Sequence, residues 1–268
     1  MLFNKYNFSI RSLFFSTFAI CIITAIYLIW PQTSANKENQ FTVAMMSGWA
    51  PFMIINNQGN YEGFDVAVAQ EIARRMNKEL VIKDMGSLAP TFIALDQESV
   101  DAVMSGLDIT DVRRKKLTLI PYSGEDVTNF TLLFWQNLPN NITTIQDLAN
   151  QQATICAEPG SAQAKFLDTI AGIQEKSLSK LEEMILDIKY GKSDAMLVEP
   201  RIANRLQKLE PQLIALNVPL PREYQTFGYG IAIKPNNTEL AKQMNNTISE
   251  MKTDGTLTTI KQQWQMEE

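Results

Sequence analysis

The sequence predicts an α/β protein of two lobes, and three observations support this fold class. From Phe41 onward, short apolar segments typical of buried strands alternate with segments whose apolar residues recur at helical spacing. A second series of the same kind begins near Thr131. The length of 268 residues allows two domains of about 100 residues each. We therefore predict two α/β units within one chain.

The first series predicts strand, helix, strand, helix and strand, in that order. Asp65 is placed to cap the first of these helices, in which Val66, Ile72 and Met76 share an apolar face. This order requires helical crossovers between parallel strands. The predicted strands are residues 41–45, 80–82 and 102–104, and the predicted helices are residues 65–76 and 90–95.

The second series ends with a return to the first unit. Ser161 opens a helix after a Pro-Gly turn, and Pro200 opens another at a position where proline is tolerated. Residues 211–221 contain three prolines and are predicted to form a loop. We expect lobe 1 to comprise residues 36–127 and 224–268 and lobe 2 to comprise residues 128–223, with hinges at 126–130 and 223–227. The predicted strands are 131–135, 153–157, 195–198 and 228–233, and the further helices are 181–189, 200–208, 239–251 and 257–264.

Charge and composition exclude several classes of function. The net charge is −5, and removing the first 35 residues, which carry Lys5, Arg11 and no acid, leaves −7. This acidity argues against a nucleic-acid binder and suits a cationic ligand slightly better than an anionic one. The chain has no histidine, which removes the commonest general base and metal ligand. Cys21 lies in the N-terminal segment and Cys156 is alone in the body, so we expect no internal disulfide, no metal and no cofactor.

The N-terminal segment predicts export. Lys5 and Arg11 precede an apolar run at 13–30, and small residues stand at Thr33 and Ala35. This pattern is typical of a signal peptide cut after Ala35. The run is long enough to approach the span of a bilayer, so an uncleaved N-terminal anchor is the alternative. Both alternatives place the body in the periplasm.

Three segments carry groups suited to hold a small polar ligand. The first contains Trp49 and the Gly-Phe-Asp triplet at 63–65, the second runs through 101–113, and the third runs through 191–200. In this order and spacing they resemble the polar amino-acid-binding proteins of ABC importers, the solute-binding proteins of family 3, and in particular their arginine-binding members. The resemblance covers residues 41–264. It implies a type II periplasmic-binding-protein fold, a ligand between the lobes, and an inner-membrane ABC permease as partner.

A free amino acid presents a carboxylate and an ammonium group close together, so its site needs a fixed cation and an opposed carboxylate. The resemblance places Arg113, with the Asp108 backbone N–H, on the ligand carboxylate and Glu199 on the ammonium group. Plainer interpretations exist, because Arg113 lies in a run of four basic residues and Glu199 could cap the helix that follows it. The remaining implied site residues are Ser105 and Gly106 near the ammonium group, Trp49 and Leu88 as walls, and Gly160, Ser161 and Ala162 at a helix start in lobe 2.

Arginine is the favoured ligand, with glutamine or histidine next. The turn at 105–110 and the segments at 190–193 and 219–223 are similar to those of arginine-binding members, and a guanidinium would stack on Trp49. One feature opposes this choice, because Met46 stands where members that bind cationic side chains often carry an acid. The guanidinium would then need another acceptor, for which the candidates are Glu158, Asp126 and Gln225.

Two other functions compete with transport. A membrane-anchored receptor module would use the apolar run at 13–30 as a permanent anchor. A periplasmic dehydratase of the same fold would need a general acid or base, for which Glu158 or Glu199 could serve. With no histidine and no recognisable nucleophile motif, we expect no enzymatic activity.

Overall fold

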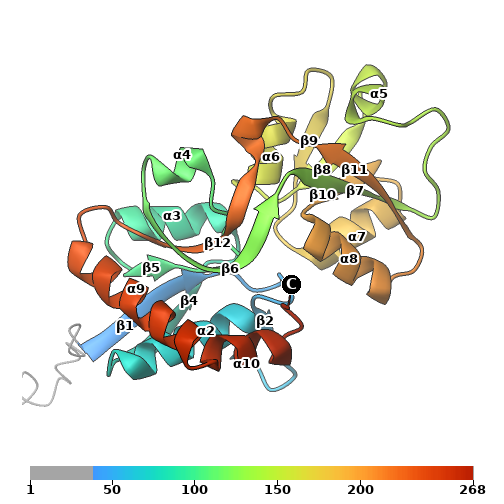
Figure 1. Cartoon of the computed structure of the whole chain (residues 1–268). Coiled ribbons are helices and arrows are strands. Elements are labelled where there is room, and N and C mark those ends of the chain that lie inside the picture. The colour runs from blue at the N-terminus through green and yellow to red at the C-terminus, as the bar shows by residue number, and fades with distance from the viewer. Residues whose placement is uncertain (1–38, 268) are drawn as a thin grey trace, which may run out of the picture. The chain divides into compact units, whose positions relative to one another are not determined.

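The computed structural model describes residues 39–267, so the predicted leader at 1–35 lies outside the described residues. Within this range the strands form two five-stranded sheets and one two-stranded sheet. We call the part built on the first five-stranded sheet lobe 1 and the part built on the second lobe 2 (Figure 1). Among residues 39–267, no helix combines the length and the apolar character that crossing a membrane requires.

Lobe 1 takes its elements from both ends of the described chain. Before lobe 2 it has β1 (Gln40–Met45), β2 (Ile54–Ile55), β3 (Tyr61–Glu62), α2 (Phe64–Arg75), β4 (Glu79–Asp84), α3 (Leu88–Asp96), β5 (Ala102–Val103), α4 (Asp111–Arg114) and β6 (Thr118–Val127). After lobe 2 it has β12 (Thr226–Ile233), α9 (Thr238–Thr253) and α10 (Thr256–Gln263).

Lobe 2 is built from the middle of the chain. Its elements are β7 (Asn129–Trp135), α5 (Ile145–Asn150), β8 (Thr154–Ala157), α6 (Ala162–Leu167), β9 (Gln174–Ser177), α7 (Leu181–Lys189), β10 (Ala195–Val198), α8 (Pro200–Leu209) and β11 (Leu213–Pro219). A short 3-10 helix, η2 (Arg222–Tyr224), precedes β12. The predicted starts of α6 after Ser161 and of α8 at Pro200 are confirmed.

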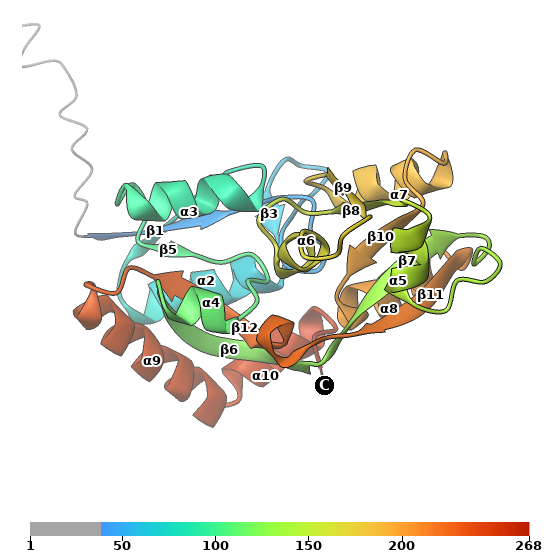
Figure 2. The ribbon, with the colours of Figure 1, turned by 90° about the horizontal axis from the view of Figure 1, so that it is seen from above.

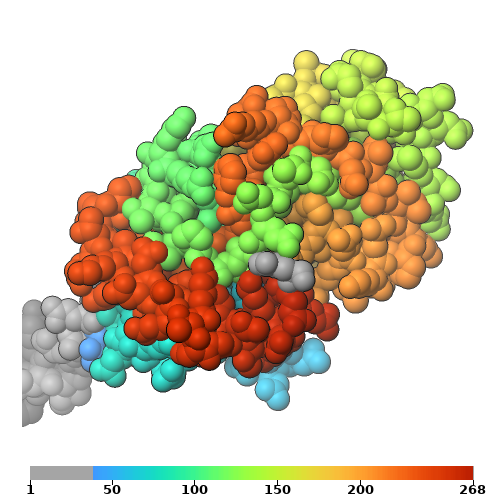
Figure 3. All heavy atoms as spheres, viewed as in Figure 1, coloured from blue at the N-terminus to red at the C-terminus, as the bar shows by residue number. Residues whose placement is uncertain are grey.

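The first sheet has the strand order β4-β1-β5-β12-β6, and β1 pairs in parallel with both β4 and β5, as predicted. The chain runs outward from β1 to β4 and then back across β1 to β5. Right-handed crossovers in opposite directions place α2 and α3 on opposite faces of the sheet (Figure 2). β12 returns antiparallel between β5 and β6, and α9 and α10 form the lower part of the face of lobe 1 seen in Figure 3.

The second sheet has the strand order β11-β7-β10-β8-β9. β8 is parallel to β9 and β10, whereas β7 is antiparallel to β10 and β11. The chain therefore passes between the sheets twice, from β6 to β7 and from β11 to β12. These two passages are the hinge strands expected of this fold class.

The hydrophobic cores reflect the alternation of side chains along each strand. On β7, Phe130, Leu132 and Phe134 belong to a cluster within lobe 2, whereas Leu133 belongs to a larger cluster that also contains the buried residues of lobe 1. Successive side chains of a strand face opposite sides of its sheet. One face of the second sheet therefore packs in the cluster within lobe 2. The other packs against α7 and α8 of the same lobe, whose apolar residues belong to the larger cluster.

Two predictions about local structure are wrong. Asp65 does not cap α2, whose N-cap is Gly63 at a φ of 142°. A side chain at Gly63 would meet the Phe52 carbonyl oxygen at 2.1 Å, so only glycine fits there. The loop predicted at 211–221 contains β11, an edge strand that pairs with β7 alone and ends at Pro219. Proline is tolerated at the edges and ends of sheets because the backbone N–H that it lacks is not needed there for a hydrogen bond to a neighbouring strand.

Candidate functional site

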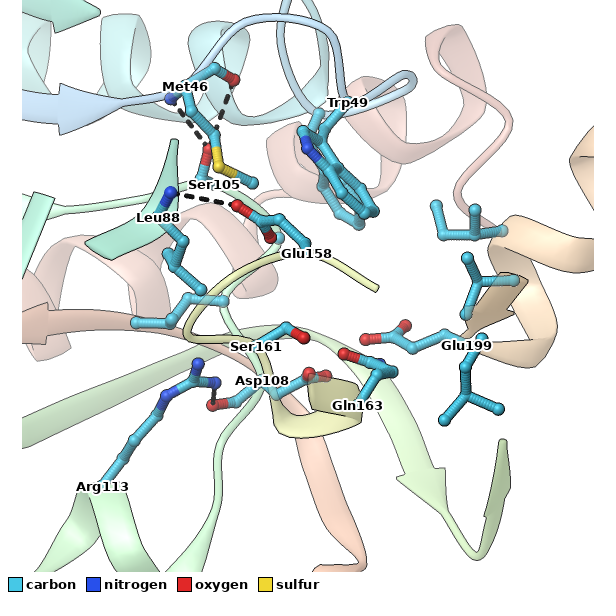
Figure 4. A pocket seen from close by; sticks show the side chains of 16 residues that line it. Met46, Trp49, Leu88, Ser105, Asp108, Arg113, Glu158, Ser161, Gln163 and Glu199 are labelled. Atoms are coloured by element: carbon cyan, nitrogen blue, oxygen red, sulfur yellow. Dashed lines mark hydrogen bonds between the residues drawn. The ribbon is translucent and has the colours of Figure 1, made fainter. Parts of the chain in front are cut away.

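A pocket lies between the two lobes (Figure 4). Its walls come from the chain that follows β1, β5 and β8, from the end of β10 and the residue after it, and from α3, α4, α6 and α8. Ligands of open α/β sheets bind beyond the carboxyl ends of the strands, and this pocket obeys that rule. The lining residues are Met46, Trp49, Phe52, Leu88, Ser105, Gly106, Leu107, Asp108, Arg113, Glu158, Ser161, Gln163, Leu197, Val198, Glu199 and Ile202.

Aromatic side chains form one wall of the pocket. Trp49 lies in the loop after β1, and its Nε1–H donates to the Ser179 carbonyl oxygen of lobe 2 at 2.7 Å. Phe52 packs edge-on against Tyr229, with ring centroids 4.9 Å apart. The indole is thereby held by both lobes, which fixes a flat face against which a ligand side chain can stack.

The turn at Ser105 and Gly106 is held by the buried carboxylate of Asp65. The Gly106 N–H donates to Asp65 Oδ2 at 2.6 Å, and the Tyr122 hydroxyl donates to Oδ1 at 2.6 Å. Burial raises the pKa of Asp65 to about 7, although both hydrogen bonds act in the opposite direction. Gly106 has a φ of 58°, and a Cβ there would lie 2.5 Å from the Phe52 ring. The turn can therefore approach the pocket wall only as glycine.

Arg113 is the buried member of a basic run. The Thr110 side chain caps α4 by accepting from the Arg113 backbone N–H at 3.1 Å, which aims the guanidinium inward. Its Nη1 donates to the Asp108 carbonyl oxygen at 2.7 Å and its Nη2 to the Gly160 carbonyl oxygen at 3.2 Å. Its Nε is buried without a hydrogen-bond partner. Residues 114–116 are exposed, so the fold separates Arg113 from its basic neighbours.

Glu199 and Asp108 form a pair of buried carboxyls opposite Arg113. Glu199 is the N-cap residue of α8 but makes no capping hydrogen bond with its side chain. It instead accepts from the hydroxyl of Tyr229, across the boundary between the lobes. Burial raises the pKa of Glu199 well above its usual range, and the Asp108 carboxylate raises it further. Asp108 Oδ1 is buried without a hydrogen-bond partner. This pair is suited to receive a cation.

Glu158 is a third buried carboxyl, with 4% of its surface exposed. It follows β8 in lobe 2 and accepts from the Leu88 N–H of lobe 1 at 3.0 Å. Burial raises its pKa to about 8. Among the three acceptors predicted for a guanidinium, Glu158 lines the pocket, Asp126 is exposed on β6, and Gln225 donates to the Leu220 carbonyl oxygen instead.

Hydrogen bonds between the lobes show that they are closed on each other. Trp49 bonds to Ser179, the Leu88 N–H to Glu158, and Tyr229 to Glu199, each pair joining lobe 1 to lobe 2. The pocket is therefore shielded from water on several sides. Charges in such a place interact more strongly than at the surface.

The sequence of residues 41–267 matches the family model of the bacterial extracellular solute-binding proteins, family 3. The chain belongs to this family. One relative is the probable ABC transporter arginine-binding protein ArtJ of Chlamydia trachomatis serovar D, at 26% identity over 85% of this chain and 87% of the relative. Another is the L-cystine-binding protein TcyJ of Escherichia coli K12, at 26% identity over 85% of this chain and 83% of the relative. A crystal structure of a mutant of ArgBP from T. maritima shares 25% identity and a TM-score of 0.76, covering 86% of this chain and 97% of that one.

In this member of family 3, most of the residues predicted for the site lie together. Arg113, Asp108, Glu199, Ser105, Gly106, Ser161, Trp49 and Leu88 line the pocket. Gly160 and Ala162 do not line it, although the Gly160 carbonyl oxygen accepts from Arg113. The Ser161 hydroxyl caps α6 by accepting from the Ala164 N–H at 3.0 Å. Its own hydrogen is still available to donate to a ligand.

Sequence reasoning missed the apolar lining and one polar group. Phe52, Leu107 and Ile202 are neighbours of predicted site residues, but apolar residues beside a motif are most often core. Gln163 follows the predicted Ser161 and Ala162 and could have been found from its place in the first turn of α6. Within residues 39–267, no cluster of three or more acids or cysteines is arranged to hold a metal ion.

Proposed function

We propose that this protein binds a free α-amino acid between its lobes in the periplasm and delivers it to an ABC permease in the inner membrane. The observation that carries the proposal is that Arg113 of lobe 1 and Glu199 of lobe 2 line one buried pocket. A zwitterion needs two opposite fixed charges close together. Family membership supports a binding role without turnover, and the leader predicted at 1–35 supports export.

The free donors of Arg113 suit the ligand carboxylate. A guanidinium has five N–H groups, and two of them are used by the carbonyl oxygens of Asp108 and Gly160. The Nε–H and one further N–H on each terminal nitrogen remain for a bidentate contact. On the other side, Glu199 and Asp108 would share the ligand ammonium group, whose positive charge offsets part of their combined negative charge. Both ends of the zwitterion are thus matched.

L-Arginine is the ligand that we favour. Relatives named for arginine binding, including ArtJ and ArgBP, support this choice, whereas TcyJ is named for cystine. The pocket contains three carboxyls, Asp108, Glu158 and Glu199, against the single cation Arg113. A ligand of positive net charge reduces this imbalance, and cystine, which is neutral overall, does not. Glutamine and histidine are the next candidates.

Ligand contacts shared between the lobes would couple binding to closure. Lobe 1 supplies Arg113 and Asp108 and lobe 2 adds Glu199, so the full set of charged contacts is engaged only in the closed state. We propose that residues 36–127 and 224–268 move as one lobe and residues 128–223 as the other. Hinges at 126–130 and 223–227 would absorb the rotation. The permease would then recognise the closed, loaded form.

A thermal-shift panel of the twenty amino acids with ornithine and citrulline tests the proposal. At a hundred times Kd, a ligand adds about 2.7 kcal/mol of stability. For a chain of this size that corresponds to an increase in Tm of roughly 5–11 °C. Agmatine, which is arginine without its carboxylate, serves as the control and should give no shift. A panel without any response, or an equal response to agmatine, would refute binding of the zwitterion.

A further inference from the structure

Glu158 is a buried carboxylate without a cation beside it. It lies in the chain between β8 and α6, and its hydrogen bond comes from the neutral Leu88 N–H at 3.0 Å. Among the described residues, no lysine or arginine nitrogen lies within 4.0 Å of its oxygens. Burying a carboxylate without a partner is costly, and proteins keep such groups mostly where they have a use.

The place of Glu158 separates it from the groups assigned to the zwitterion. In Figure 4, Arg113, Asp108 and Glu199 lie toward one end of the pocket, and Glu158 lies between Leu88 and Trp49 toward the other. An amino acid held by its carboxylate and ammonium groups at the first end would extend its side chain toward the second. The tip of that side chain would then arrive beside Glu158 and the Trp49 ring.

The positive charge that acts on Glu158 is that of Arg113, which lies toward the other end of the pocket. Met46, on the lobe 1 side of this end, is apolar and buried, and its backbone N–H is taken by Ser105 Oγ at 3.0 Å. Burial raises the pKa of Glu158 to about 8, with the Leu88 N–H and Arg113 opposing the shift and Asp108 adding to it. A cation brought in by the ligand would restore the charged form of this carboxyl.

We propose that Glu158 is the specificity-determining residue of the pocket and restricts it to amino acids whose side chain ends in a cation, with Trp49 as the stacking surface for that cation. This inference rests on the function proposed above. Glu158 belongs to lobe 2 and Trp49 to lobe 1, so a cationic side chain links the two lobes a second time, in addition to the zwitterion. Selection of the ligand and closure of the lobes are then one event.

L-Arginine and L-citrulline test the proposal as a matched pair, because citrulline replaces the guanidinium by an uncharged group of similar shape. By isothermal titration calorimetry, we expect the purified protein to bind arginine about 100-fold more tightly than citrulline, a difference of about 2.8 kcal/mol. In Glu158→Gln the ratio should fall to about threefold or less. Glu158→Asp, which keeps the charge, should retain a preference of at least about tenfold. The control is Glu183→Gln, which removes the same charge from an exposed position on α7 and should keep the full ratio.

The outcomes separate this inference from the proposed function. If the unmodified protein binds arginine and citrulline equally, or if Glu158→Gln keeps the preference for arginine, the role of Glu158 is refuted while amino-acid binding stands. If no amino acid binds at all, the proposed function itself fails. If Glu158→Gln does not fold, the comparison of Glu158→Asp with Glu183→Gln decides, because the shorter Asp side chain should lower the arginine preference below that of Glu183→Gln. Equal preferences in these two variants would refute the role of Glu158.

Discussion

Arg113→Ala is expected to abolish ligand binding, and Arg114→Ala is its matched control. The two arginines are neighbours in the same short helix and carry the same charge. Arg113 is buried in the pocket, whereas the Arg114 side chain is 47% exposed, pairs with Asp111 at 3.5 Å and lies over the Phe227 ring at 4.7 Å. Any effect of net charge alone would therefore appear in both variants.

The magnitude follows from the donors that Arg113 has left. After its bonds to the Asp108 and Gly160 carbonyl oxygens, it can still donate two parallel hydrogen bonds to a ligand carboxylate. Hydrogen bonds to charged groups contribute about 1.5–3 kcal/mol each. Their loss amounts to about 3–6 kcal/mol, which weakens binding by roughly 100- to 10,000-fold. For Arg114→Ala we expect a change of about threefold at most, because salt screens an exposed charge.

Calorimetric titration at physiological ionic strength is the assay, with the amino acid that gives the largest thermal shift as titrant. The far-ultraviolet circular dichroism of each variant shows whether it is folded. A folded Arg113→Ala that binds within tenfold of the unmodified protein would refute the assignment of Arg113 to the carboxylate. Equal losses in both variants would show instead that long-range charge, rather than contact, controls the affinity.

Three further predictions address the wall, the scaffold and the pH dependence. Trp49→Phe keeps an aromatic wall but loses the hydrogen bond to the Ser179 carbonyl oxygen. Calorimetry should therefore show roughly fivefold weaker ligand binding, a loss of about 1 kcal/mol. An unchanged affinity would argue against a role of this interlobe hydrogen bond in binding. Thr144→Ala removes half of the capping box with Asp147, so Tm should fall by about 2–4 °C while affinity stays the same, since α5 does not line the pocket. The pKa of Asp65 is raised to about 7 in the folded state, so its contribution to stability is present below its unfolded pKa of 3.8 and is lost as the pH rises to about 7. The unfolding free energy of Asp65→Asn relative to the unmodified protein should therefore rise between pH 4 and 7, and a difference independent of pH would contradict the shifted pKa.

The elements that could be predicted are those whose local pattern agrees with their tertiary role. α7 and β10 have the predicted bounds because their apolar periodicity is undisturbed. β6 contains Pro121 and Gly124, which disfavour strands locally, and it forms because β12 pairs along its length. β9 (Gln174–Ser177) is polar and lies at the edge of its sheet, so alternation gives no signal there. Pairing partners far away in the sequence decide such segments.

The candidate site also contains residues that could be predicted from the sequence and contacts that could not. Segments that carry a motif, such as the turn at Ser105 and Gly106, could be placed in the pocket from the sequence. The contact between Leu88 and Glu158 could not, because it joins residues 70 positions apart and exists only when the lobes close. Composition suggested that Arg113 lies on a solvated basic face, whereas in the fold the guanidinium is buried and held by the carbonyl oxygens of Asp108 and Gly160. Contacts that form only when the two lobes close could not be predicted from the sequence.

The charges in the pocket explain why closure should depend on a ligand. Closing the lobes removes the carboxyls of Asp108, Glu158 and Glu199 from water together with one guanidinium, so two negative charges are in excess or must be neutralised by protons. The raised pKa values of Glu158 and Glu199 reflect that cost. A neutral zwitterion brings one charge of each sign and leaves the excess at two. An amino acid with a cationic side chain brings one more positive than negative charge and reduces the excess to one. The same imbalance that disfavours the closed empty form therefore favours a cationic ligand, and the selectivity of the pocket and the energetics of its closure have one electrostatic cause.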